Sequence, residues 1–411
     1  MSTFQSEVDV AVIGAGSAGI AAARRLAEAG GVSVLVLEAR DRAGGRVWTI
    51  DAEGLPADMG AEWLHSADRN ALTPLAKQLG FAINTQRPDW TTRLRHSGEN
   101  AEAEADWLAE REAFYWAAHR AAQEPEDRPA AALLTPGGRW NALLDATSTW
   151  ANAVELEEIS VKDSDRYEDS GINWRLHRGY GKLFEALAEG LPIAYGTPVS
   201  TIAHGGRTLT IATSRGTVLA RRVVVAVPTA ILAEERLRFD PPLPGKLAAA
   251  AGLPLGLADK LVLAYDGNLP ERYLIGSTRR RETMSYQVRP FGRPRINCFF
   301  GGRFAAGLEG DGIEAMAAFA IDELAGILGS AVRNQLRPLA ASFWRRDAFA
   351  RGSYSYALPG HADDRARLAA PVEQRIFFAG EACSPNFFST AHGAYETGIA
   401  AAEAALKSLG R

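Results

Sequence analysis

The chain has 411 residues, enough for two sizeable cores, because single cores rarely exceed roughly 250–300 residues. Its net charge of −4 speaks against a general nucleic-acid binder, which would carry a basic stripe. The two cysteines, Cys298 and Cys383, offer neither a disulfide framework nor a metal-binding pattern, so no metal is expected.

The sequence also indicates where the protein resides. The opening segment, MSTFQSEVDV, lacks the basic and apolar regions of a secretion signal. No stretch reaches the roughly 18 uncharged apolar residues that span a bilayer. We therefore expect a cytoplasmic protein without a membrane partner.

Residues 8–38 read as a strand, a glycine turn, a helix and a second strand. The apolar run VDVAVI is followed by Gly14, Gly16 and Gly19 in the spacing G-x-G-x-x-G, and VSVLVLE ends in Glu38. Such glycines permit a tight turn, close approach of a pyrophosphate and close helix packing, while the acid binds a ribose hydroxyl. Glycines alone could simply form a turn, but the position of Glu38 favours dinucleotide binding. The residues expected to bind here are Gly14, Gly16, Ser17, Ala18, Gly19, Glu38, Ala39 and Arg40.

A second glycine turn follows at once, in EARDRAGGRVWT. Gly44 and Gly45 let the backbone pass close to a long cofactor, and Arg46 offers forked donors to phosphate. An exposed loop is the alternative interpretation. The segment resembles the second signature of the FAD-dependent amine oxidase superfamily, which implies FAD in place of a nicotinamide cofactor.

The next segment, LPADMGAEWLHS, is similar to a Gly-Ala-x-Trp-x-His stretch that passes beside the flavin, most closely in the polyamine oxidase branch. The resemblance implies flavin contacts for Gly60, Ala61, Glu62 and Trp63. It also places His65 near the substrate nitrogen, where an imidazole that titrates near neutrality can handle a proton. A structural role is the alternative for this histidine.

Residues 70–170 are predicted to be mainly helical and match no recognisable chemistry. Their acidic run, ELEEISVKDSDRYEDSG, is most simply a solvated face, although it could also attract a cationic amine. Further on, the resemblance to FAD oxidoreductases places Val199 against the adenine. The buried run VVVAVP, which ends at Pro228, then returns to the nucleotide domain.

Lys260 begins the predicted strand of LGLADKLVLAYD. In the family, a lysine at this place hydrogen-bonds a water molecule that touches flavin N5. A buried lysine is unfavourable unless it is paired, so chemistry is a reasonable explanation for it. The alternative is an ordinary strand-edge lysine. The rest of 260–345 is predicted to alternate strands with one helix at 312–328.

The segment SFWRRDAFARGSYSYALPG matches the stretch that forms the aromatic cage of monoamine oxidases. The resemblance implies Trp344 near the flavin ring and Tyr354 as one wall of the cage. Where those enzymes attach flavin through cysteine, this chain has Ser353, so noncovalent FAD is expected.

The last motif, FFAGEACSPNFFSTAHGAYETGIAAAEAAL, is a strand, a Gly380-Glu381 turn and a helix expected to start near Thr390 and Ala391. A helix N-terminus stabilises an anion by roughly 0.3–1 kcal/mol, which suits the pyrimidine edge of reduced flavin. Monoamine oxidases place a second cage tyrosine where Thr390 stands, whereas the spermine-oxidase-like branch carries the Thr-x-His-Gly-Ala pattern. Both ends of the chain are therefore predicted to build one flavin site.

These patterns predict an α/β fold with a discontinuous Rossmann-type FAD-binding domain, at 1–75, 176–235 and 345–411. An α+β substrate-binding domain, with a mixed sheet and a helical insertion, is expected at 76–175 and 236–344. The implied reaction is hydride transfer from the amine α-carbon to flavin N5, hydrolysis of the imine and reoxidation by oxygen with release of hydrogen peroxide. The partners would be a small amine and molecular oxygen, with a homodimer as one option. Catalytic roles fall to Lys260, His65 and Tyr354.

Three alternatives remain open from the sequence. An L-amino acid oxidase needs a cation facing the carboxylate, and EWLH holds no arginine at the matching slot. A flavin desaturase fits the set of catalytic residues less well. A non-catalytic Rossmann scaffold, like the GDP-dissociation inhibitors, would not need Arg46 and the Gly380-Glu381 turn.

Overall fold

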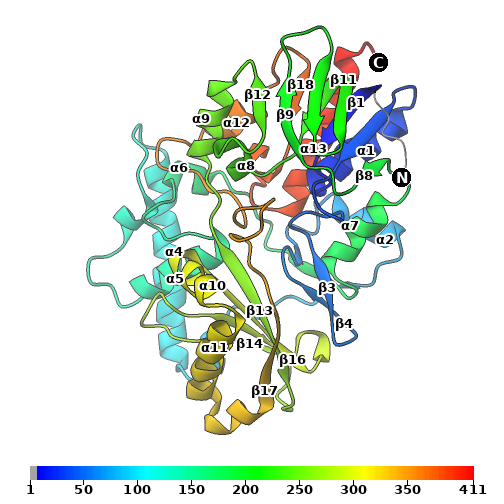
Figure 1. Cartoon of the computed structure of the whole chain (residues 1–411). Helices are drawn as coiled ribbons and strands as arrows, with labels where there is room; N and C mark the ends of the chain where they lie inside the picture. The colour runs from blue at the N-terminus through cyan, green and yellow to red at the C-terminus, as the bar shows by residue number, and fades with distance from the viewer. Residues whose placement is uncertain (1–6) are drawn as a thin grey trace.

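The computed structural model describes residues 7–411, so the segment 1–6, part of the stretch examined for a secretion signal, lies outside the described residues. The chain forms two lobes (Figure 1). Strand β1 and the C-terminal helix α13 lie together in the upper lobe. No helix within residues 7–411 is both long and apolar enough to cross a bilayer.

The upper lobe is built on an eight-stranded sheet. Its strands run β12 (Arg238–Asp240), β9 (Val199–Ala203), β10 (Leu209–Thr213), β11 (Gly216–Val225), β1 (Glu7–Ile13), β2 (Val34–Leu37) and β8 (Ile193–Ala194), and β18 (Ile376–Phe378) pairs with β11. The pairs β1–β11, β1–β2 and β11–β18 are parallel, while β9, β10 and β11 form an antiparallel meander. The opening and closing strands therefore flank the same strand, β11.

Both faces of this sheet are covered, because successive side chains of β1 point to opposite sides. Val10 and Val12 pack against the core under helices α1 (Ser17–Ala29) and α13 (Ala391–Ser408). Ala11 and Ile13 join the opposite core. The helices on that side are α8 (Thr229–Ala233), α9 (Pro244–Gly252) and α12 (Asp364–Ala369). This burial explains why β1 reads as a continuous apolar run.

The lower lobe contains a five-stranded sheet in the order β14 (Arg272–Ile275), β15 (Ser285–Val288), β16 (Arg295–Gly301), β13 (Ala258–Tyr265) and β17 (Leu336–Ala341). Every pairing in this sheet is antiparallel. A mixed sheet was expected in the substrate-binding domain, but parallel and antiparallel pairs occur together in the eight-stranded sheet of the upper lobe. Helix α11 (Ile313–Leu328) packs on one face, where Leu261 and Ile296 meet Met316 and Leu324. The sequence predicted one helix in this region, but a second, α10 (Gly302–Asp311), precedes it.

The remaining elements pack around the two large sheets. The helical insertion contains α3 (Arg93–His96), α4 (Ala101–Ala122), α5 (Asn141–Ala151) and α6 (Val161–Asp165), and α2 (Leu72–Gln78) and α7 (Tyr180–Ala188) cover the upper lobe. Small sheets pair β3 (Thr49–Ala52) with β4 (Leu55–Asp58), and β5 (Trp63–Leu64) and β6 (Ile83–Asn84) with β7 (Trp174–Leu176). Short 3-10 helices lie at Ala130–Leu133, Pro290–Gly292, Ser330–Gln335 and Glu381–Cys383.

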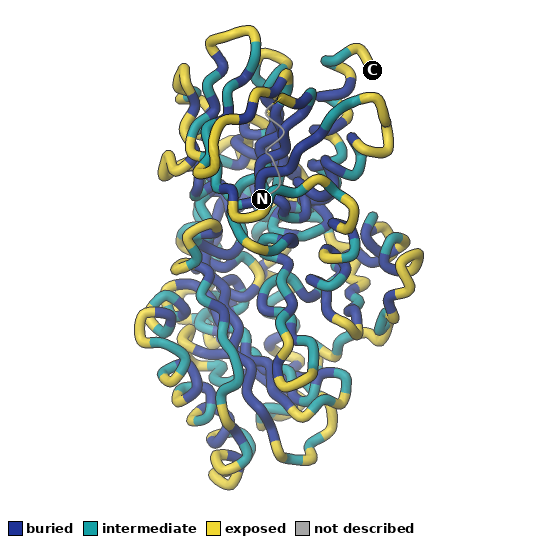
Figure 2. Tube along the Cα trace, turned by 45° about the vertical axis from the view of Figure 1, so that its right-hand side comes forward, coloured by how far each residue is buried: buried dark blue, intermediate teal, exposed yellow. Residues whose placement is uncertain are grey.

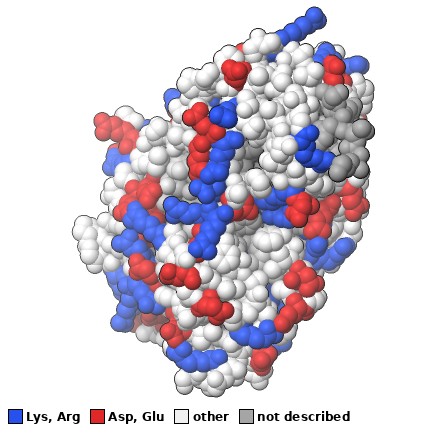
Figure 3. Space-filling model, in the orientation of Figure 1, with Lys and Arg blue, Asp and Glu red and all other residues white. Residues whose placement is uncertain are grey.

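The predicted domain division stays a prediction, although β12 extends the eight-stranded sheet past residue 235. Buried segments run through the middle of both lobes, and exposed ones are mostly loops at the edges (Figure 2). Acidic and basic side chains are intermixed over the face seen in Figure 3. That face therefore carries no extended surface of one sign.

Candidate flavin and substrate site

One cavity of about 1210 Å³ is lined by segments from both ends of the chain and from both sheets. Of the residues predicted for the site, those that line it are Gly14, Gly16, Ser17, Ala18, Glu38, Ala39, Arg40, Gly44, Gly45, Arg46, Gly60, Ala61, Glu62, Trp63, His65, Val199, Pro228, Lys260, Trp344, Tyr354, Gly380, Glu381, Thr390 and Ala391. Gly19 is the exception. A Cβ there would come within 1.8 Å of the Gly14 carbonyl oxygen, so Gly19 serves the close packing of α1 on the turn.

The two glycine turns form one backbone cradle. Gly14 has a φ of +97°, and a Cβ on it would lie 2.7 Å from the carbonyl oxygen of Ala226. The second turn packs directly on the first, since the amide of Gly44 donates to the carbonyl of Ala15 at 2.8 Å. A Cβ on Gly45 would lie 3.1 Å from the Cα of Gly16. Side chains at these positions would press against neighbouring backbone, so the close packing of the two turns depends on glycine.

Glu38 directly follows β2 and holds the first glycine turn through hydrogen bonds. Its Oε2 accepts a hydrogen bond from the amide of Ala15 at 2.6 Å, and its Oε1 accepts one from the amide of Arg40 at 2.8 Å. The side chain is buried but still lines the cavity. The carboxylate thus holds two segments of the cradle, and its predicted contact with a ribose stays a prediction.

Arg46 joins the second glycine turn to the closing turn. One of its terminal nitrogens donates to the Oε1 of Glu381 at 3.0 Å and also to the carbonyl of Ser353. Glu381 accepts further bonds from the hydroxyl of Ser355 at 2.6 Å and from the amide of Ser389 at 3.0 Å. Burial acts to raise the pKa of Glu381, but Arg46 and these donors hold it below its usual value. A buried anion with this many donors fixes the closing turn in one position.

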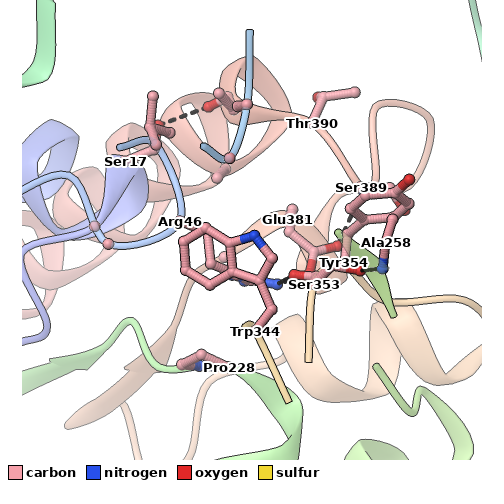
Figure 4. Close-up of a pocket in the computed structure, with 18 of the residues that line it drawn as sticks. Ser17, Arg46, Pro228, Ala258, Trp344, Ser353, Tyr354, Glu381, Ser389 and Thr390 are labelled. Carbon is pink, nitrogen blue, oxygen red and sulfur yellow. Dashed lines mark hydrogen bonds and ion pairs between the residues drawn. The ribbon is translucent and has the colours of Figure 1, made fainter. Parts of the chain in front are cut away.

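The first and last helices meet at the cavity. The hydroxyl of Ser17 donates to the carbonyl of Ala391 at 2.6 Å, across 374 positions of sequence (Figure 4). A Cβ on Gly398 would lie 2.1 Å from the carbonyl oxygen of Ala18, so the two helices cross with no space for a side chain. Thr390 caps α13 by accepting from the amide of Gly393 at 3.0 Å. Two helix N-termini, each favourable for an anion, therefore face one cavity.

The residues that line the cavity fit a dinucleotide such as FAD, which carries a flavin ring in addition to its adenine. Bare backbone at two adjacent turns and free N–H groups at helix starts suit a pyrophosphate. Ligand pockets commonly measure about 300–1,000 Å³, so this cavity has room for a long cofactor and a substrate.

Figure 4 shows Ser17 at one end of the cavity and Tyr354 at the other, with Arg46, Glu381 and Trp344 between them. The indole nitrogen of Trp344 donates to the carbonyl of Met59 at 3.1 Å, which fixes the ring. The Tyr354 hydroxyl donates to the carbonyl of Trp150 at 2.6 Å, and burial raises the pKa of this tyrosine. Both rings are therefore held rigidly at the cavity wall.

Lys260 lies on β13, which has β16 on one side and β17 on the other. This internal position excludes the alternative of an edge-strand lysine. Its ammonium group forms an ion pair with Glu62 at 2.8 Å and donates to the carbonyl of Asp58 at 3.1 Å. Glu62 is also 3.4 Å from the guanidinium of Arg175. The sequence predicted a flavin contact for Glu62 and gave no sign of either ion pair.

His65 lines the same cavity and is hydrogen-bonded through Nδ1 to the Oδ1 of Asn173 at 2.6 Å. Because that oxygen is an acceptor, the proton is assigned to Nδ1, which leaves Nε2 as an acceptor. Burial lowers the pKa of His65 below 6.5, against the opposing effect of Asn173. The ring is therefore neutral near pH 7 and able to accept a hydrogen bond.

Several lining residues were not identified from the sequence. They include aromatic side chains from separate parts of the chain: Trp90, Tyr115, Tyr167, Tyr273, Phe299 and Phe388. Tyr167 and Phe388 have ring centroids 5.4 Å apart, and Trp90 contacts both Trp63 and Tyr273 edge to face. No local pattern distinguishes these residues from ordinary core aromatics.

Comparisons with known proteins agree with this geometry. The family model described as "Flavin containing amine oxidoreductase" matches residues 17–169 and 103–406. Polyamine oxidase 4 of Oryza sativa subsp. japonica is 31% identical, over 98% of this chain and 90% of its own length. Among solved structures, cyclohexylamine oxidase from Brevibacterium oxydans IH-35A superposes with a TM-score of 0.80 at 22% identity, over 98% of this chain and 100% of that one. A putrescine oxidase bound to putrescine gives a TM-score of 0.77 at 21% identity, over 98% and 99%.

The family model spans most of the chain, and the rice relative matches this chain almost from end to end. The glycine cradle, the paired helix N-termini and the closing Gly-Glu turn are the features by which such a protein would hold a flavin. The chain belongs to the flavin-containing amine oxidoreductase family.

Proposed function

We propose that this enzyme uses FAD to oxidise the carbon–nitrogen bond of an amine, with a polyamine as the substrate. The observation that carries the proposal is the single cavity, in which the nucleotide cradle continues into a space with Lys260, His65 and aromatic rings on its wall. The polyamine class is supported by the rice relative, whose name is Polyamine oxidase 4.

When bound, FAD would supply the redox chemistry, as acceptor of a hydride from the carbon next to the amine nitrogen and donor of the two electrons to oxygen. The side chains orient the amine and exclude water, while His65 Nε2 accepts a hydrogen bond or a proton from the substrate ammonium group. Water then hydrolyses the imine to a carbonyl compound and a shorter amine. Molecular oxygen takes up two electrons and two protons and leaves as hydrogen peroxide.

We further propose that FAD is held without a covalent bond. Ser353, at the position of the attachment cysteine in related enzymes, accepts from the amide of Ala258 at 2.9 Å and donates to the carbonyl of Gly256 at 3.1 Å. A hydroxyl cannot form a thioether. Acid precipitation is the measurement, because noncovalent FAD passes into the supernatant and attached FAD stays with the protein.

An L-amino acid oxidase is the second candidate, because Arg93 and Arg111 line the cavity. Arg93 is buried, and its Nε has no hydrogen-bond partner among the described residues. Such a guanidinium could pair with a substrate carboxylate. The polyamine assignment is preferred because both arginines come from the helical insertion, whereas Lys260 and His65 lie on the strands and turn beside the flavin segments.

A substrate panel coupled to peroxide detection tests the proposal. Diamines, polyamines, aromatic monoamines and L-amino acids would be compared by kcat/KM, with oxygen uptake measured in parallel. We expect the polyamines to give the highest kcat/KM, with one peroxide formed per oxygen consumed. Equal or faster turnover of L-amino acids would reverse the ranking of the two candidates.

We also propose a cytoplasmic location. In support, Cys298 and Cys383 are both free and buried, as is usual for proteins of a reducing compartment. Fractionation of source cells, with the protein followed by immunoblot, is the measurement.

A further inference from the structure

We propose that Glu62 is the positioning residue of Lys260, whose carboxylate keeps the lysine ammonium charged and fixed at the wall of the flavin cavity. The inference rests on the flavin site of the proposed function and goes beyond it, because it assigns a role to a carboxylate that neither the sequence motifs nor the relatives' names indicate.

Glu62 and Lys260 form a short ion pair between two largely buried side chains. Glu62 lies just before β5, and Lys260 lies 198 positions later on β13. Their charged atoms are 2.8 Å apart, and the two side chains are only 7% and 10% exposed. A second bond from the ammonium to the carbonyl of Asp58, at 3.1 Å, fixes its direction. Because both side chains are largely buried, removal of one partner would leave the other charge poorly compensated.

Electrostatics make Glu62 a permanent anion. Burial acts to raise its pKa, but attraction by Lys260 and Arg175 outweighs burial and lowers the pKa to about 2. Lys260 therefore faces a fixed negative charge throughout the neutral pH range. The lysine ammonium, paired with this carboxylate, can donate hydrogen bonds into the cavity.

Most of the other charged groups near the pair are cations, so the charge of the Lys260 ammonium depends strongly on Glu62. Arg175 and Arg295 both interact with Glu62, and Arg293 lies within the same group. Asp58 is the other acid, and burial together with Glu62 raises its pKa to about 6. Without Glu62, Asp58 would be the remaining acid beside a buried ammonium and three arginines, and both desolvation and repulsion by the arginines would favour loss of the lysine proton.

A pH titration of the bound flavin tests the inference without any turnover. We expect E62Q, loaded with FAD, to show a new single-proton transition in its visible absorption between about pH 7 and 9, because desolvation can lower a lysine pKa by several units. The wild-type protein should show none in that range. The double variant E62Q/K260M should also show none, which assigns the transition to the lysine.

Glu271 provides the matched control. It pairs with Nη2 of Arg175 at 3.0 Å, whereas Glu62 lies next to Nη1, so E271Q removes a neighbouring carboxylate and leaves the lysine paired with Glu62. We expect the E271Q titration to match that of the wild type. A flat titration of E62Q, or a transition that persists in E62Q/K260M, would overturn the inference.

A second measurement does not need the cofactor. The free energy of unfolding of E62Q and of E62Q/K260M would be compared across the same pH range in the FAD-free chains. A lysine pKa lowered in the folded state makes the difference between the two variants depend on pH, and a constant difference would overturn the inference. Because neither measurement uses an amine, failure here is distinguishable from failure of the proposed function, which the substrate panel detects.

Discussion

At the scale of single residues, Asp259 shows how a buried carboxylate sets the pH dependence of folding. Its Oδ1 accepts from the Ser342 hydroxyl at 2.8 Å and from the Trp344 amide at 3.2 Å, while its Oδ2 is buried without a partner. Burial, opposed by the Ser342 bond, raises the pKa of Asp259 to about 7. An unfolded aspartate titrates near about 3.9, so folding takes up a proton between these values and stability falls as the pH rises from 4 to 7.

We therefore expect D259N to remove this part of the pH dependence. An amide keeps both accepted bonds and stays neutral, so the variant should gain on the order of 2 kcal/mol relative to wild type on going from pH 5 to pH 8. Urea unfolding at the two pH values is the measurement. D311N, at an exposed aspartate of α10, is the control and should follow the wild type. A D259N curve parallel to that of the wild type would contradict the expectation.

At the scale of elements, the crossing of α1 and α13 depends on one glycine. A Cβ on Gly398 would lie 2.1 Å from the backbone of Ala18, which cannot move aside as a flexible side chain could. G398A should separate the helices, lower stability by about 1–3 kcal/mol and weaken FAD binding. Thermal unfolding and fluorescence titration with FAD measure the two effects.

The control for G398A is another glycine inside a helix. Gly326 of α11 has open space where its Cβ would be, so G326A should be neutral or stabilise by about 0.5–1 kcal/mol through higher helix propensity. Comparable losses in both variants would show that helix propensity, and not the crossing, decides the result.

The sequence predicted those features correctly whose residues all lie within one short segment. The strand, the turn at Gly14 and Gly16, and helix α1 follow each other directly, and the start of α13 at Thr390 and Ala391 was placed correctly. It failed where a role depends on a distant partner. The ion pair between Glu62 and Lys260 joins residues 198 positions apart, and no local pattern encodes it.

Helix α10 was missed for a different reason. Its sequence, GRFAAGLEGD, contains three glycines, which lower helix propensity. Tertiary packing compensates, because Ala305 is fully buried against the core of the five-stranded sheet. Propensity is a weak guide where burial decides the conformation.

At the scale of the whole molecule, a buried polar chain ties the helical insertion to the flavin cavity. Asp163 of α6 pairs with Arg365 of α12 at 2.6 Å, and both side chains are almost fully buried. Arg365 then donates to the hydroxyl of Ser355 at 3.0 Å, and Ser355 donates to Glu381 at the cavity. The position of the insertion is thus coupled to the residues expected to hold the cofactor.

D163N should disturb both lobes at once. It leaves the guanidinium of Arg365 buried without its counter-charge, which costs roughly 3–5 kcal/mol. Hydrogen exchange should rise in residues 155–170 and also around Glu381, with weaker FAD binding. The exposed pair of Asp322 and Arg333 is the control, and D322N should change stability by less than about 1 kcal/mol. Exchange confined to 155–170 would show that the chain does not transmit the change.

The hydrogen bond between Ser17 and Ala391 has a consequence for biosynthesis. The ribosome releases the N-terminal strand and helix long before it makes the segment that packs on them. Until α13 has been synthesised, the apolar side of α1, including Ile20 and Leu26, has no α13 to cover it. Loading of the flavin therefore belongs after the nascent chain leaves the exit tunnel, and a prematurely terminated polypeptide would be a client for chaperones and proteases.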